Sequence, residues 1–132
     1  MQDSRQGIGI LLEDIDYFCS SPKVEWSGGE VGASGSIGIP YPNYDSAVDR
    51  LIHNMYEGDF VRPGYLARKE ELGLNSREDV AAFIPKASME DLLVLLSFYV
   101  RGERFCDGLI ASAIESGELG SILTRLKEIA AI

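Results

Sequence analysis

The chain has 132 residues, of which 45% are hydrophobic, and it carries a formal net charge of −9. This length fits one domain with a core that needs no metal or disulfide, and the composition argues against a disordered chain. An acidic chain repels nucleic-acid phosphates, and no apolar run approaches the ~20 residues of a membrane span, so direct binding to either nucleic acid or membrane is not expected.

The negative charge is concentrated in the first part of the chain. Residues 1–60 contain ten acidic and three basic residues, a net charge of −7. This balance favours a protein partner with a basic surface, and the alternative is that the charge only keeps the protein soluble. The N-terminal residues lack the basic start and apolar stretch of a signal peptide, so we expect a cytoplasmic protein of a prokaryote, or of a phage within its host.

Residues 8–19 are predicted to form one amphipathic helix. Apolar side chains recur there at the helical period, at Ile8, Leu11, Leu12, Ile15 and Cys19. The acids Glu13, Asp14 and Asp16 lie off this stripe, either as a solvated face or as part of a contact with a partner. Cys19 and Cys106 belong to no CxxC motif and are expected to be buried free thiols, although a disulfide between them stays open.

The glycine-rich stretch that follows is predicted to form a β-hairpin over residues 24–39. Val24-Glu25-Trp26 and Ser36-Ile37-Gly38-Ile39 would be its strands. An isolated two-stranded ribbon is marginal in water, so it must lie against the helices, with Trp26 as the anchor. Trp26, Glu30, Tyr41 and Tyr44 are also candidates for a protein interface, because aromatic side chains bury large rigid areas there; the alternative is that these rings pack the hairpin onto the bundle.

The rest of the chain reads as a series of helices. One should begin after Asp45 or Ser46 and end at Gly58, a short one should span Tyr65–Glu71, and another should follow Asn75 or Ser76 and end at Pro85. The segment after Ser88 is apolar almost all round and should be the central helix, and two more helices should cover residues 105–116 and the chain from Glu118. The prediction is a single mainly α domain over residues 1–132, a compact bundle of about six helices with the hairpin packed on its flank.

Arg101 and Arg104 are the candidates for an anion site. They flank Gly102 where the central helix gives way to the next, and a helix N-terminus offers free N–H groups to a phosphate or carboxylate. The alternative is that both arginines form ion pairs with neighbouring acids such as Glu103. Gly108, predicted to lie within the next helix, is expected to admit a close neighbour such as an aromatic ring.

No catalytic or metal-binding motif stands out in the sequence. His53 is the only histidine, and one histidine with two scattered cysteines is a poor ligand supply for zinc. The acids lack the spacing of a calcium-binding loop. We therefore expect no metal and no cofactor, and we regard an enzyme as less favoured than a binding protein without excluding it.

Two stretches resemble an uncharacterised bacterial family that is catalogued only as a domain of unknown function. One is the segment from Val100 to Gly108 with its continuation through Ala111–Gly117 and Ile122–Lys127. The other is the pair Trp26–Glu30 and Pro40–Tyr44. The resemblance implies a prokaryotic or phage setting. It implies no activity.

Three functions remain open from the sequence. The favoured one is a non-enzymatic acidic protein-binding module, in its sharper form a small inhibitor that covers a basic surface of a nucleic-acid-handling host complex. The second is a small-molecule, nucleotide or anion binder, or an enzyme, that uses Arg101 and Arg104. The third is a homo-oligomeric structural component that associates through the last helix, which ends at Ile129-Ala130-Ala131-Ile132.

Overall fold

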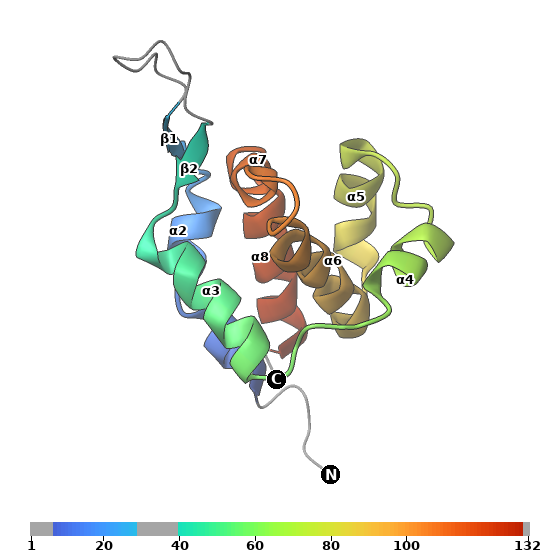
Figure 1. Ribbon diagram of the computed structural model, residues 1–132. Coiled ribbons are helices and arrows are strands. Elements are labelled where there is room, and N and C mark those ends of the chain that lie inside the picture. The colour runs from blue at the N-terminus through green and yellow to red at the C-terminus, as the bar shows by residue number, and fades with distance from the viewer. Residues whose placement is uncertain (1–6, 29–39, 131–132) are drawn as a thin grey trace.

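The structure, a computed structural model, describes residues 7–28 and 40–130. It confirms a mainly helical fold with a small antiparallel ribbon at one side of the helices (Figure 1). The elements in chain order, with η for a 3₁₀ helix, are η1 (Ile8–Leu12), α2 (Ile15–Cys19), β1 (Glu25–Ser27), β2 (Tyr41–Asn43), α3 (Ser46–Glu57), α4 (Tyr65–Glu71), α5 (Arg77–Phe83), η2 (Ile84–Lys86), α6 (Met89–Gly102), α7 (Leu109–Glu115) and α8 (Glu118–Ala130).

Helix α6 is the central helix, as predicted. Its N-cap is Ser88, whose hydroxyl accepts a hydrogen bond from the backbone N–H of Asp91 at 3.2 Å. Consecutive side chains from Leu92 to Ser97 are buried, so the helix meets neighbours on several sides, namely α3, α4, α7 and α8. The short connections after α6 and α7 let these three C-terminal helices pack around one core.

The predictions for α3 and α4 are confirmed at the residues that begin and end them, and the prediction for α5 is confirmed at its start. The Asp45 side chain caps α3 by accepting from the N–H of Ala47 at 2.9 Å, and Gly58 ends that helix. Ser76 and Asp79 form a capping box at the start of α5. Pro85 does not break the chain as predicted, because it lies within the 3₁₀ turn η2 that continues α5.

The single helix predicted over residues 8–19 is wrong. The chain forms the 3₁₀ helix η1 and then the short helix α2, with Asp14 outside helical geometry between them. A 3₁₀ helix has about three residues per turn, so the face that points to the core rotates relative to an α-helix. Phe18 is therefore buried in place of Cys19, whose thiol is exposed, and the prediction of a buried Cys19 fails for this reason.

The hairpin is present, with a different second strand. β1 pairs with β2 so that Trp26 lies opposite Pro42 and Ser27 lies opposite Tyr41. The predicted strand at residues 36–39 lies outside the described residues. β2 contains Pro42, which a strand at a sheet edge tolerates because no ladder bond is needed on its outer side.

The helix predicted from Phe105 begins four residues later. Residues 103–108 form turns, and Gly108 takes a left-handed conformation with φ of 94° as the N-cap of α7. A left-handed residue cannot continue an α-helix, which is why α7 starts only at Leu109. Cys106 therefore lies in the exposed turn and is not buried, and both cysteines are free.

α2 crosses closely over α8 at Gly120. A Cβ atom on Gly120 would lie 2.8 Å from the carbonyl oxygen of Phe18 and 3.0 Å from the Cα of Cys19. Both are backbone atoms, so neither can move aside as a side-chain end would. The absence of a side chain at Gly120 therefore allows α2 to pack closely against α8.

We expect Gly120→Ala to lower the free energy of unfolding by about 1–3 kcal/mol, the usual cost of overpacking. Alanine is the better helix former by up to ~1 kcal/mol, so any loss reports the steric conflict. The matched control is Gly9→Ala in η1, where an added Cβ meets nothing within 4 Å. Urea denaturation of both variants measures the difference, and equal stability of the two would contradict the close crossing.

Candidate functional site

The start of α7 is held by a carboxylate and a tyrosine. The Glu103 carboxylate accepts from the backbone N–H of Gly108 at 2.9 Å and from that of Ile110 at 2.7 Å. The Tyr44 hydroxyl donates to Glu103 Oε1 at 2.8 Å and accepts from the N–H of Ala111 at 3.0 Å. Partial burial, followed by the bond to Glu103, raises the pKa of Tyr44 above its ordinary value. Tyr44, an interface candidate in the sequence, thus has a structural task.

The two candidate anion-binding arginines lie on either side of this cluster. Arg101 is in the last turn of α6 and is half-buried, and Arg104 is exposed in the turn that follows. Neither forms an ion pair within the part of the chain that the structure describes. The N–H groups that would complete an anion site at α7 are already bonded to Glu103 and Tyr44. The anion site stays a prediction, without support from free helix N–H groups.

Large aromatic side chains are exposed around the ribbon and the α6–α7 turn. Trp26 exposes 46% of its surface, Tyr41 52% and Phe105 84%. The Trp26 ring covers Gly108, where an added Cβ would lie 2.5 Å from the ring, so the predicted contact of an aromatic ring with this glycine is confirmed. Phe105 precedes Gly108 by three residues in the same turn. We call Trp26, Tyr41 and Phe105 the aromatic surface.

The pairing register of the ribbon places its two exposed aromatic side chains on opposite faces. Paired residues in an antiparallel ribbon point to the same face, and successive residues alternate. Trp26, opposite Pro42, therefore points toward the α6–α7 turn, and Tyr41 points to the other face. The ribbon is also attached to α7 just before β1 begins, because the N–H of the buried Val24 donates to Glu115 Oε2 at 2.9 Å. Phe105 could not be singled out from the sequence, since it is predicted there as the first residue of a helix.

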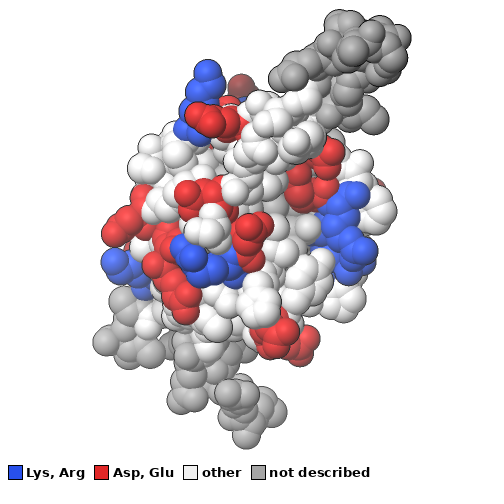
Figure 2. All heavy atoms as spheres, turned by 60° about the vertical axis from the view of Figure 1, so that its left-hand side comes forward, with Lys and Arg blue, Asp and Glu red and all other residues white. Residues whose placement is uncertain are grey.

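The acidic candidates of the first segment do not form one continuous acidic strip. Asp14 makes a two-pronged ion pair with Arg50 of α3, with both N–O distances at 2.8 Å, which lowers the pKa of Asp14. Glu13 and Asp16 are exposed. In Figure 2, which turns the side of α2 and α3 forward, acidic groups alternate with basic and uncharged ones. Glu30, the remaining interface candidate, lies outside the described residues.

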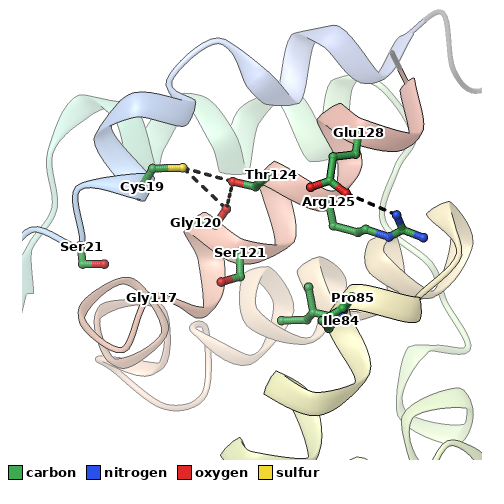
Figure 3. A pocket seen from close by; sticks show the side chains of 10 residues that line it. All are labelled: Cys19, Ser21, Ile84, Pro85, Gly117, Gly120, Ser121, Thr124, Arg125 and Glu128. Atoms are coloured by element: carbon green, nitrogen blue, oxygen red, sulfur yellow. Dashed lines mark hydrogen bonds and ion pairs between the residues drawn. The ribbon is translucent and has the colours of Figure 1, made fainter. Parts of the chain in front are cut away.

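A hollow of about 520 Å³ lies beside the α2–α8 crossing (Figure 3). The thiol of Cys19 lies in its wall, 3.7 Å from the carbonyl oxygen of Gly120 and 3.4 Å from the Thr124 hydroxyl. At the opposite end, Arg125 Nη1 lies 3.4 Å from a carboxylate oxygen of Glu128. The two charged residues of the lining, Arg125 and Glu128, are thus paired with each other.

A second hollow, of about 230 Å³, contains a buried carboxylate that sequence analysis did not single out. Glu118, the first residue of α8, exposes only 7% of its surface, and its Oε2 accepts a hydrogen bond from the Tyr99 hydroxyl. Burial, followed by this bond, raises the pKa of Tyr99. The sequence does not reveal that Glu118 is buried, because an acid in the first turn of a helix normally faces solvent.

Other chemistry finds little support in the described residues. They contain no group of three or more histidine, cysteine or acidic side chains placed to hold a metal ion. His53 is exposed on α3. No described helix has the length and apolar content needed to cross a membrane. Ile129 and Ala130, part of the proposed oligomer contact, are half-buried against the core, and the two residues after them are not described.

Comparison with known proteins identifies a family. A model described as a family of unknown function (DUF6508) matches residues 4–131, so the chain belongs to that family. The resemblance to a domain of unknown function is thereby confirmed. No curated protein and no solved structure matches the chain.

We expect Tyr44→Phe to lower the free energy of unfolding by about 1–3 kcal/mol, because it leaves the Ala111 N–H without its acceptor at a partly buried site. The matched control is Tyr41→Phe, which removes an exposed hydroxyl and should change stability by less than about 0.5 kcal/mol. Urea denaturation separates the two. Equal effects would show that the Tyr44 hydroxyl is not part of the α7 cap.

Tyr44 and Tyr99 should resist ionisation for as long as the protein is folded. Their pKa values are higher in the folded protein than in the unfolded chain, so the stability they contribute is present below pH ~10 and is lost as the pH rises further. Tyrosinate absorbance should rise in two steps, the second together with the loss of helical circular dichroism. Tyr99→Phe should reduce the second step, and complete ionisation with the helices intact would contradict this assignment.

Proposed function

We propose that this member of a family of unknown function is a non-enzymatic protein-binding module that holds its partner on the aromatic surface. The observation that carries the proposal is the exposure of three large aromatic side chains on the ribbon and the α6–α7 turn, with Phe105 84% exposed. Trp26 and Tyr41 point to opposite faces of the ribbon, so a partner that contacts all three side chains lies around the ribbon as well as on the turn. Exposed aromatic groups of this kind are typical of interfaces, because their burial on binding releases much ordered water at a small cost in side-chain entropy. Single exposed apolar residues need no explanation, whereas a group of them does.

The segments that bear these residues are held in place before binding. Trp26 rests on Gly108, Val24 is bonded to Glu115, and the turn beyond Phe105 is pinned by Glu103 and Tyr44. A surface that is already ordered loses less entropy when a partner binds. The order of the ribbon and the turn before binding therefore supports a docking role. Such a role accounts for the many polar contacts made to this short turn.

The net charge of −9 supports a partner with a basic surface. Charge of one sign accelerates encounters with a surface of the other sign over distances of about one Debye length, roughly 8 Å in physiological salt. Acidic groups alternate with basic ones on the face seen in Figure 2, so we assign the charge a role in steering and the aromatic surface the larger share of the affinity.

A finer version of the proposal names the partner class. In it the protein is a prokaryotic or phage inhibitor that covers the basic groove of a nucleic-acid-handling complex, with the acids of residues 1–60 in the place of phosphates. The charge distribution along the sequence supports this version. It requires binding that weakens steeply as the salt concentration rises, whereas a contact dominated by the aromatic surface requires only a modest effect.

The test is photo-crosslinking in the cell that makes the protein. A photoreactive phenylalanine at position 105 should capture one protein, and the same residue at position 56, an exposed tyrosine on α3, should not. Phe105→Ala should reduce capture of that protein in pull-downs at least tenfold, with the fold intact because the ring is exposed. The matched control Tyr56→Ala should leave capture unchanged.

Two outcomes would overturn the proposal. One is capture of the same proteins from positions 105 and 56, which indicates nonspecific contact. The other is a specific partner whose binding Phe105→Ala and Tyr41→Ala both leave unchanged. Repeating the wash at low and high salt separates the versions, since a partner retained at high salt excludes the phosphate-mimicking inhibitor.

A further inference from the structure

The second hollow has the features of a ligand site. It opens between α5 and α7, with α6 beneath it, and its apolar wall is formed by Val80, Phe98, Leu109 and Ala113. Its charged groups are Lys69 of α4, Arg77 at the start of α5, and Glu118 of α8. At about 230 Å³ it is smaller than the roughly 300 Å³ at which pockets for drug-sized molecules begin, so its ligand has few atoms.

The carboxylate of Glu118 is only half satisfied. Oε2 accepts from the Tyr99 hydroxyl, but Oε1 is buried without a hydrogen-bond donor among the described residues. Arg77 Nε lies 3.4 Å from Oε1, close enough for an ion pair but without hydrogen-bond geometry. A buried carboxylate oxygen with no donor is costly, and it marks the place where an N–H group of a ligand would bind.

The rim of the same hollow is positive. The Arg77 side chain is 61% exposed, and its Nη2 donates to the Ser112 hydroxyl, which turns the guanidinium across the opening. The Lys69 ammonium lies 4.4 Å from the centre of the Phe98 ring and donates to the carbonyl oxygen of Leu74 at 2.6 Å. Two cations and one anion line the hollow, so a simple cation is repelled at the rim and a simple anion meets Glu118 at the floor.

We propose that this hollow binds a small zwitterion, a free α-amino acid, whose carboxylate draws the exposed Arg77 guanidinium away from Glu118 and whose ammonium group then donates to the Oε1 atom that Arg77 had shielded. The ammonium group of the ligand supplies the hydrogen-bond donor that Oε1 lacks. The carboxylate of the ligand takes the place of Glu118 as the anionic partner of Arg77. The apolar wall leaves room for a small side chain. This site is independent of the aromatic surface, and it stands whether or not the proposed protein partner exists.

The experiment is a binding screen of the whole chain with each of the twenty protein amino acids at millimolar concentration, by ligand-observed NMR and then by calorimetry. At least one small amino acid should bind. Its decarboxylated amine and its deaminated acid are the probes for the two charges, and each should bind at least tenfold more weakly. For alanine these probes are ethylamine and propionate.

Two variants assign the charges to residues. Glu118→Gln should weaken binding of the amino acid at least tenfold, and Arg77→Gln should weaken it while leaving the amine probe unaffected. Arg125→Gln is the matched control, since Arg125 lies at the other hollow, and it should bind as the unchanged protein does. If Glu118→Gln does not fold, Arg77→Gln decides, because the Arg77 side chain is exposed and its loss spares the core.

The proposal is overturned if none of the twenty amino acids binds. It is equally overturned if the amine or the acid binds as tightly as the amino acid, since one charge then suffices. Binding that Arg77→Gln leaves unchanged places the ligand elsewhere. The photo-crosslinking result at position 105 changes none of these outcomes, so failure of one proposal is distinguishable from failure of the other.

Discussion

The arrangement of the helices depends on burying α6, which is apolar on nearly every side. Six consecutive residues from Leu92 to Ser97 are buried, and a single neighbouring helix covers only one face of such a helix. α3, α4, α7 and α8 therefore gather around it, and α2 is held against α8 in turn. Close approach is needed at the end of α6 as well, where a Cβ on Gly102 would lie 2.4 Å from a methyl group of Leu109. The exposed turn that contains Phe105 follows directly after this buried helix.

The carboxylates of Glu103 and Glu118, both near the ends of helices, differ in how many of their hydrogen bonds are made. Glu103 is satisfied by two backbone N–H groups and the Tyr44 hydroxyl, so it contributes to stability and has nothing to offer a ligand. Glu118 is more deeply buried and has one oxygen bonded to Tyr99 and the other without a donor. Fully bonded polar clusters make a local structure rigid, whereas a half-satisfied one carries a free-energy cost that binding can offset. This contrast separates the structural cluster from the candidate ligand site.

The two candidate sites differ in what they would recognise. The aromatic surface is exposed and placed on short segments, which suits a large partner, and the hollow at Glu118 is small and charged, which suits a metabolite. Both are bordered by α7, whose first turn supports Trp26 through Gly108 and whose Ser112 orients Arg77.

The sequence by itself determined the local features: the mainly helical class, the bounds of α4, the caps at Asp45 and Ser76, and the central place of α6. These depend on periodicity and on bonds between residues a few positions apart, which can be read along the chain. Tertiary structure decided the rest, including the break at Asp14, the exposure of both cysteines and the roles of Tyr44 and Glu118. Tyr44 lies 59 residues from Glu103 in the sequence. Because side chains so far apart meet only after the helices have packed, no local pattern could distinguish Glu118, which is buried, from the many acids that face water.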